Sequence, residues 1–331
     1  MIDYNACQDA TMTTTVRPNE RHEPASAQSA LAVELTAVIV AVTADAPRVL
    51  TLRDGEALPS GPLQTRHRTL QSGVRSWVED QTGHALGYVE QLYTFADRER
   101  TREETVEHRI SISYLGLTRE RSDGEAADSA WHDWYRFFPW EDWRRGQPRI
   151  IADVILPRLR SWARQGAAAQ MRERRERIDV AFGVKPHGWN EEFVLQRYEL
   201  LWEAGLVPEA RGHTGSATVI AGTPMTHDYR RILATGIARL RAKIKYRPVV
   251  FELMPTSFTL FQLQRAVEAL AGQRLHKQNF RRLIEQQGLV EETGKVTTAT
   301  GGRPAKLFRF RRTVVVERTA AGSKLPLHRS A

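Results

Sequence analysis

The chain has 331 residues, a net charge of +9 and a single cysteine, Cys7. This length is enough for two domains with their own cores, and one cysteine excludes both an intrachain disulfide and a cysteine-based zinc site. The most apolar run, near residues 31–42, is interrupted by Glu34 and is too short to cross a bilayer, so we expect a soluble cytoplasmic protein with no membrane partner.

The first 28 residues are polar, with several Thr and Pro but few apolar side chains. Such a segment cannot bury enough apolar surface to offset the entropy lost on ordering, so residues 1–28 are predicted to be a disordered tail. The tail also lacks the apolar core of a secretory signal.

Strand-like and helical segments alternate in the next part of the chain. Residues 35–43 and 48–52 are β-rich apolar runs, and strand-like segments return at 88–95 and 109–117. Between them, residues 68–81 predict a helix that ends at Thr82-Gly83. The helix has four apolar residues on one side: Leu70, Val74, Trp77 and Val78.

Aromatic residues crowd the region that follows: Trp131, Trp134, Phe137, Phe138, Trp140 and Trp143. This density predicts a buried junction, where a sheet edge packs under the next helix, rather than a surface that stacks on bases.

Helical composition continues through residues 150–182, and the mixed-charge stretch at 171–177 indicates a solvated face. A second helix is expected at 190–205. We expect four of its side chains to face a partner element, for which a subunit interface is a fair use: Phe193, Tyr198, Leu201 and Trp202. Residues 161–225 are therefore predicted to be a helical connector and dimer region.

Positive charge gathers in the last third of the chain. Residues 226–331 contain 21 Lys plus Arg and 7 Asp plus Glu, a net charge of +14, which leaves the first 225 residues at −5. A localised cationic surface suits nucleic-acid binding, because each Lys or Arg near a phosphate releases condensed counterions.

Three helices are predicted beneath this charge. The first has apolar residues at helical spacing and ends before Pro248; these residues are Leu233, Ile237, Leu240 and Ile244. The second spans residues 258–272, where Thr259 and Gln262 have the spacing of a capping box and Gly272 is the expected stop. Together with the third helix they are expected to form a three-helix core.

The third helix, residues 276–287, has the pattern of a recognition helix. Phe280, Leu283 and Ile284 form an inner apolar stripe. Lys277, Arg281 and Arg282 lie off this stripe, where long cationic donors can reach phosphates or guanine in the major groove.

Two strands, 289–293 and 305–312, then predict a β-wing joined by a loop rich in Gly, Thr and Arg. The plainer alternative is a charged helical domain that binds no nucleic acid, but the succession of helix, turn, helix and wing favours DNA reading. The candidate DNA contacts are Thr259, Gln262, Lys277, Asn279, Arg281, Arg282, Arg303, Lys306 and Arg309.

Five stretches of the last hundred residues carry a family resemblance: 227–232, 239–246, 258–260, 279–282 and 302–309. They resemble the winged-helix domain of Nudix-related transcriptional regulators of NAD metabolism. The resemblance implies a bacterial repressor that binds a palindromic double-stranded DNA operator as a homodimer and responds to a nucleotide.

The resemblance also implies an α+β fold in three parts. A Nudix-like α/β/α sandwich would occupy residues 29–160, followed by the helical connector at 161–225. A winged helix-turn-helix would occupy residues 226–318, and residues 319–331 would form a flexible tail.

In this family Leu58-Pro-Ser-Gly61 would enter a Nudix box, G-x5-E-x7-R-E-U-x-E-E-x-G-U, whose glutamates hold Mg²⁺. Counting forward from Gly61 places His67 at the first glutamate and Arg75 at the arginine. Counting back from Gly83 places Ser76-Trp77 at the Arg-Glu pair and Asp80-Gln81 at the Glu-Glu pair. The two counts differ by one residue, and in either register most of the carboxylates are missing. We therefore expect no catalytic residue and no metal site.

Cationic side chains have gathered where the carboxylates are missing, and Arg suits bidentate contacts with a diphosphate. Strand aromatics could stack on a base, although most of them fit the core better. The candidate ligand-binding residues are Arg66, His67, Arg68, Arg75, Tyr93, Arg109 and Tyr114. The alternative for each of the four box residues is an ordinary surface position on the box helix.

The resemblance implies a repressor of NAD biosynthesis or salvage genes that requires no cofactor and whose effector is NAD, ADP-ribose or ATP. One rival is a Nudix pyrophosphatase with residual Mg-dependent activity that also binds DNA. Another is a nonspecific binder of RNA or DNA.

Overall fold

The computed structural model describes residues 32–96, 109–120, 126–210, 222–298, 304–311 and 313. Both predicted tails, Cys7 and Arg303 therefore lie outside the described residues.

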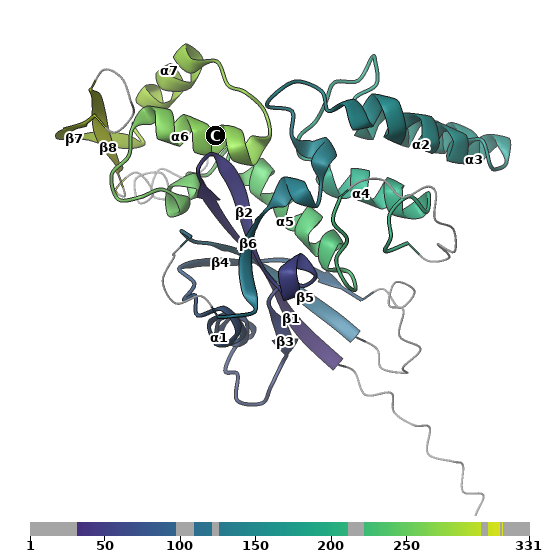
Figure 1. Ribbon diagram of the computed structural model, residues 1–331, viewed down its shortest axis with the longest axis horizontal. Helices are drawn as coiled ribbons and strands as arrows, with labels where there is room; N and C mark the ends of the chain where they lie inside the picture. Colours follow the sequence, from purple (N-terminus) through teal and green to yellow (C-terminus); the bar gives the residue numbers. More distant parts are fainter. Residues whose placement is uncertain are drawn as a thin grey trace, which may run out of the picture.

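Six strands form one mixed sheet (Figure 1). They are β1 (Ala32–Thr43), β2 (Ala46–Leu52), β3 (Ser60–Pro62), β4 (Tyr88–Phe95), β5 (Arg109–Leu117) and β6 (Ser129–Asp133). The order is β4-β5-β1-β2-β6, with β3 paired to β1. Only β1 and β5 run parallel among these described pairs, with Val40 opposite Leu117. The strands predicted at 35–43, 48–52, 88–95 and 109–117 are confirmed.

The helices and the two remaining strands are labelled in Figure 1. They are α1 (Leu70–Thr82), α2 (Leu156–Ala163), α3 (Ala168–Ala181), α4 (Val194–Glu203), α5 (Tyr229–Lys243), α6 (Leu260–Ala271), α7 (Lys277–Gln287), β7 (Val290–Thr297) and β8 (Ala305–Phe310). The helical stretch expected at 150–182 is interrupted: a π-helical turn, Ile151–Ile155, leads into α2, and the chain turns at Gly166 before α3. Glycine at this position disfavours a continuous helix.

One helix covers each face of the sheet. Helix α1 packs its buried Val74 and Val78 against Leu35 and Ile39 of β1. Helix α5 covers the opposite face and lies so close to β1 that a Cβ on Gly236 would come within 2.9 Å of Val38 Cγ1. The sandwich therefore takes its third layer from α5, which the sequence analysis assigned to the winged helix. Because α5 also contacts α6, it belongs to both parts.

The aromatic cluster is buried, as predicted: Trp134, Phe137, Phe138 and Trp140 are inaccessible to solvent. The prediction that α4 offers four side chains to a partner was wrong for two of them. Tyr198 and Leu201 are fully buried, and Tyr198 packs edge-on against Phe138 at 6.2 Å between ring centroids. The aromatic junction of the same chain occupies this face.

A buried carboxylate holds the sheet, the connector and α5 together. Glu141 accepts from Arg197 of α4 at 2.6 and 2.8 Å and from Arg241 of α5 at 2.6 Å, and all three side chains are buried. The surplus positive charge is met by backbone carbonyls, because Arg197 also donates to Ala181 O and Asn190 O at 2.9 Å. Charge-assisted bonds of this kind are stronger than neutral ones.

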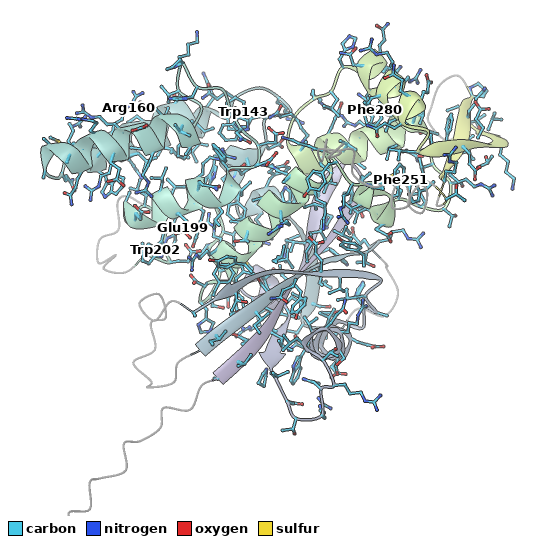
Figure 2. The ribbon with its side chains drawn as sticks, turned by 180° about the vertical axis from the view of Figure 1, so that it is seen from behind. Trp143, Arg160, Glu199, Trp202, Phe251 and Phe280 are labelled. Carbon is cyan, nitrogen blue, oxygen red and sulfur yellow. The ribbon has the colours of Figure 1, made fainter. Side chains whose placement is uncertain are left out.

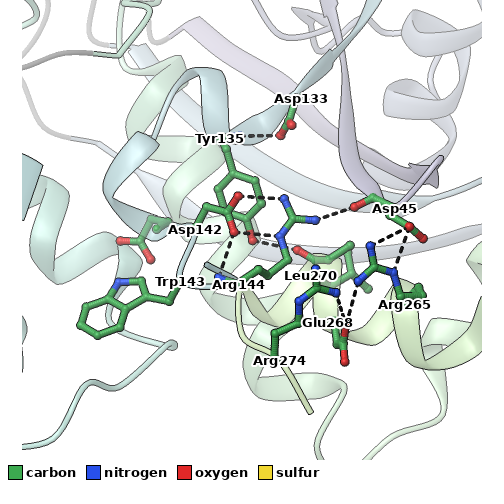
Figure 3. Close-up of polar contacts among 12 residues, drawn as sticks. Asp45, Asp133, Tyr135, Asp142, Trp143, Arg144, Arg265, Glu268, Leu270 and Arg274 are labelled. Carbon is green, nitrogen blue, oxygen red and sulfur yellow. Dashed lines mark hydrogen bonds and ion pairs between the residues drawn. The ribbon is translucent and has the colours of Figure 1, made fainter. Parts of the chain in front are cut away.

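The C-terminal end of α6 docks on the same cluster. The hydroxyl of Tyr135 donates to Ala269 O at 2.7 Å, Arg241 donates to Leu270 O at 2.9 Å, and the Trp143 amide donates to Gly272 O at 2.7 Å. The last carbonyls of a helix have no partner within the helix, so groups outside α6 satisfy them here. Figure 3 shows Tyr135, Trp143 and Leu270 at this contact.

Replacing Glu141 with glutamine is expected to lower the free energy of unfolding by roughly 3 to 5 kcal/mol, because two buried guanidiniums lose their counter-charge. Urea denaturation of Glu141→Gln and the wild type measures the difference. Glu79→Gln, at an exposed position, is the matched control and should change the free energy by less than about 0.5 kcal/mol. Equal stabilities of Glu141→Gln and the control would contradict the assigned role.

Candidate nucleic-acid interface and sensor site

Helix α6 is the second of the three helices predicted in the C-terminal module (residues 226–318, called the reading module below), and its caps fix its two ends. Thr259 Oγ1 accepts from the Gln262 amide at 3.1 Å, and Gln262 Oε1 accepts from the Thr259 amide at 2.8 Å. The predicted capping box and the Gly272 stop, with φ of 72°, are both confirmed. The buried Thr259 side chain is thus occupied at the start of α6, whereas Gln262 remains exposed.

Glu268 organises the turn that follows α6. It is buried, accepts from the Leu275 amide at 3.0 Å and from Arg274 at 2.7 Å, and bonds Gln264 at 2.9 Å. Neighbouring Arg265 bridges to Asp45 at the β1–β2 turn (Figure 3). The turn before α7 is therefore held both internally and by the sheet.

Helix α7 presents its polar side to solvent. Lys277, Asn279, Arg281 and Arg282 are all exposed, whereas Phe280 and Ile284 are buried. Leu283 departs from the predicted inner stripe because its side chain is 51% exposed, at the rim of a cavity of about 320 Å³ between α5, α6 and α7. The buried stripe is narrower than the periodicity indicated.

The wing is a two-stranded ribbon that is anchored to the segment preceding α6. Phe258 and Phe308 exchange backbone hydrogen bonds at 2.9 and 2.8 Å, and Phe310 stacks on Phe251 with centroids 4.3 Å apart. On the exposed side, Lys306 pairs with Glu292 at 2.9 Å and Arg309 pairs with Glu291 at 2.7 Å. These two candidate DNA contacts are therefore ion-paired within the wing.

The box helix α1 supports counting the Nudix box backward from Gly83. Gly83 adopts φ of 71° and caps the helix, and Val78, at an apolar box position, is buried. The glutamate position before it holds Trp77, whose ring stands where a Cβ on Gly61 would fall and whose Nε1 donates to Pro62 O at 3.0 Å. Across the described ranges, no group of three or more His, Cys, Asp or Glu residues is placed to hold a metal ion.

The candidate ligand residues of the box differ in their exposure and in their contacts. Arg66 and Arg68 are exposed, and the Arg66 guanidinium lies 5.9 Å from the centre of the Trp77 ring. His67 is half-buried beside Gly73, with Nδ1 accepting from the Gln64 amide at 3.2 Å. Arg75 instead donates to the carbonyls of Leu86 and Gly87 in the loop after α1.

The strand candidates also lie apart. Tyr93 of β4 is 57% exposed, with its ring 5.0 Å from that of Phe95. Tyr114 is buried under α1, which is a core position rather than a stacking surface. Arg109 begins β5, and its side chain lies outside the described residues.

A polar relay that the sequence analysis missed joins α1 to α5. Gln81 of α1 bonds the backbone of Ser60 at 2.8 and 3.1 Å, and Ser60 Oγ bonds the hydroxyl of Tyr229 at 2.7 Å. Glu34 of β1 accepts from both Ser60 and Tyr229, at 3.0 and 3.3 Å. No local periodicity marks these four residues, because they come from four separate elements.

Burial, followed by the charge of the neighbouring Glu34, raises the pKa of Tyr229 to about 12. A raised phenol pKa stabilises the folded state below pH 10, the pKa in the unfolded chain, and this contribution is lost as the pH rises toward 12.

The free-energy cost of Tyr229→Phe should therefore be largest at neutral pH and shrink between pH 10 and 12 by up to about 2.7 kcal/mol, since one pKa unit corresponds to about 1.36 kcal/mol. Denaturation of both proteins at pH 8, 10 and 11.5 measures this change. A cost that is independent of pH would contradict the burial of the Tyr229 hydroxyl beside Glu34.

The fold and these surfaces define a class: a Nudix-like sheet domain joined through helices to a winged helix. Residues 250–310 match the family model described as "NrtR DNA-binding winged helix domain". Over these residues the C-terminal domain is similar to the winged helix that binds DNA in NrtR proteins.

Comparison with known proteins points the same way. The chain is 41% identical over 86 residues to the "ADPR responsive transcriptional repressor NtrR" of Acinetobacter baylyi, an alignment that covers 26% of this chain and 34% of that protein. The chain thus spans about a third of this curated relative.

Its fold is similar to that of Shewanella oneidensis NrtR complexed with a 27mer DNA, with a TM-score of 0.51 and 18% identity over 86% of this chain and 95% of that chain. A second crystal structure of Shewanella oneidensis NrtR gives the same TM-score of 0.51, over 84% of this chain and 94% of that chain. Over the described ranges, no helix is both long and apolar enough to span a bilayer.

Proposed function

We propose that this chain is a dimeric transcriptional repressor of NAD biosynthesis or salvage genes whose Nudix-like domain binds ADP-ribose. The exposed cationic face of α7, on a domain that matches a DNA-binding family model, carries the proposal. The choice of ADP-ribose among adenine nucleotides rests on the name of the Acinetobacter relative. The proposed parts remain residues 29–160, 161–225 and 226–318, with α5 shared between the first and the last.

The DNA would lie across α7, whose residues Asn279, Arg281 and Arg282 read base edges or phosphates in the major groove. A dimer would present two such helices to half-sites about one turn, ~34 Å, apart, so a modest change in their spacing would release the operator. The ion-paired Lys306 and Arg309 would exchange Glu292 and Glu291 for phosphates on binding.

Replacing Arg282 with alanine should weaken binding to an operator selected from random duplexes by roughly 5- to 150-fold, since a bidentate base contact contributes about 1 to 3 kcal/mol. Binding to an unrelated duplex of equal length should change far less. Fluorescence anisotropy on both duplexes measures the two losses. Equal losses on both would favour the nonspecific binder and contradict sequence reading by Arg282.

The ligand would enter beside α1, where Arg66, His67 and Arg68 precede the helix. Tyr229 connects this helix to α5 through Ser60 and Gln81, and α5 carries the docked α6. These hydrogen bonds join the C-terminal end of α1 to the start of α5, and helix α5 itself would carry a shift of α1 to the reading module.

ADP-ribose should change the apparent operator Kd by about 5- to 150-fold, and the operator should change the affinity for ADP-ribose by the same factor, because coupling between binding sites is reciprocal. Titrations of each ligand in the presence and absence of the other measure both factors, with NAD and ATP as comparison ligands. An operator Kd that does not respond to saturating ADP-ribose would exclude it as the effector.

A measurement of turnover distinguishes this proposal from the rival, a Nudix pyrophosphatase that also binds DNA. Trp77 replaces a box glutamate, and Asp80 accepts a hydrogen bond from the Ser76 hydroxyl at 3.4 Å. We therefore expect no hydrolysis of ADP-ribose or NADH with Mg²⁺. Turnover that Asp80→Ala abolishes would overturn the assignment of a non-catalytic domain.

A further inference from the structure

The pair of helices α2 and α3 is basic within an otherwise acidic part of the chain. Residues 156–181 contain seven Arg against Glu173, Glu176 and Asp179, a net charge of +4. The first 225 residues together carry −5. The positive charge of this helix pair is therefore concentrated locally rather than shared with its surroundings.

The arginines of the pair fall into two groups. Arg174 stacks on Trp162 with its guanidinium 4.3 Å from the ring centre and donates to Gln165 O at 3.0 Å, and Arg177 is paired with Glu203 of α4. These contacts close the pair and fix it to α4.

The second group faces solvent: Arg160, Arg164, Arg172 and Arg175 are exposed, and none makes a hydrogen bond or ion pair with another described residue. Arg160 lies in α2, and Arg164 follows four residues later as the residue that caps this helix, whereas Arg172 and Arg175 are three residues apart on α3. The members of each couple therefore lie on one side of their own helix. We call these four exposed guanidiniums on two adjoining helices the arginine patch, and unpaired positive charge of this kind suits a polyanion.

This patch, defined by Arg160, Arg164, Arg172 and Arg175, lies along the edge of the molecule that carries α7. Figures 1 and 2 place α2, α3 and α7 on one side, with the sheet and α1 on the other. The helix pair is also held to the reading module, because α4 is tied by Arg197 to Glu141, which also binds Arg241 beside the α6 carbonyls.

We propose that this arginine patch contacts the phosphate backbone of the same DNA duplex, beyond the base pairs that α7 reads. The inference rests on the proposed function and extends it: the connector would lengthen the DNA footprint without adding sequence specificity. Phosphate contacts position a protein on DNA and carry no base information.

The test combines Arg160→Gln, Arg164→Gln, Arg172→Gln and Arg175→Gln in one full-length variant. Each guanidinium that contacts a phosphate contributes about 0.9 to the slope of log K against log salt, so the slope should fall by up to about 3.6 per protomer. The fall should be larger on the selected operator with long flanks than on one trimmed to its half-sites. Preference for the operator over an unrelated duplex should persist.

A second variant changes the charge of the same helix in the opposite direction, so its expected effect on DNA binding is also opposite. Glu173→Gln with Glu176→Gln removes two carboxylates from α3 and should tighten binding to the flanked operator at low salt. Thermal unfolding checks that both variants fold like the wild type, and sedimentation at the binding concentration checks their oligomeric state.

An unchanged salt slope in the folded quadruple variant would overturn the inference. A variant that loses DNA binding because it dissociates would assign the patch to a subunit interface and overturn it equally. If Arg282→Ala still weakens operator binding in either case, the proposed function stands. Absence of any operator preference in the wild-type protein would instead defeat the proposed function itself.

Discussion

One buried carboxylate governs how this molecule is assembled. Among the described residues, Glu141 is the acidic side chain that pairs with two buried guanidiniums, those of Arg197 and Arg241, which come from different helices. Desolvation lowers the pKa of Arg197, which shows that burial alone disfavours its charge. The pair is tolerated because Glu141 and several carbonyls surround it, so the sheet, α4 and α5 must all be in place together.

This requirement explains why the sheet domain and the winged helix share helix α5. Helix α5 closes the second face of the sheet, and Arg241 near its end also binds the terminal carbonyl of Leu270. Gly272 fits there because a Cβ would come within 2.5 Å of Glu141 O. Under the proposed function, a ligand that shifts α5 must therefore carry α6 with it.

Local features of the sequence predicted the reading module well, because helix caps and stripes are encoded over a few residues. Thr259, Gln262 and Gly272 form the expected caps, and Phe280 and Ile284 are buried as expected. Leu283 was placed wrongly, since periodicity cannot show how wide a stripe its neighbours cover. The prediction that Tyr198 faces a partner subunit was wrong for a related reason, because an apolar helix face does not reveal whether its partner belongs to the same chain.

Contacts between distant segments could not be predicted in the same way. Arg241 and Glu141 are 100 residues apart, and Tyr229 and Ser60 are 169 apart, so no spacing rule connects them. The prediction of ligand-binding residues was affected most by such contacts. Arg75 was expected to be free to bind a diphosphate, yet its guanidinium donates to backbone carbonyls after α1. The sequence shows which side chains are charged, whereas only the fold shows whether a charged side chain already has a partner within the protein.

The same distinction separates the arginines of the connector. Arg174 and Arg177 are committed to Trp162 and Glu203, whereas Arg160 is exposed and unpaired among the described residues. An exposed guanidinium stays hydrated until an anion displaces its bound water. The contacts of Arg174 and Arg177 hold the helices that carry the exposed arginines in place. Because α4 links this helix pair to Glu141, the connector and the winged helix would meet DNA as one body. Any ligand-driven change in half-site spacing would then arise where that body meets the sheet or a second subunit.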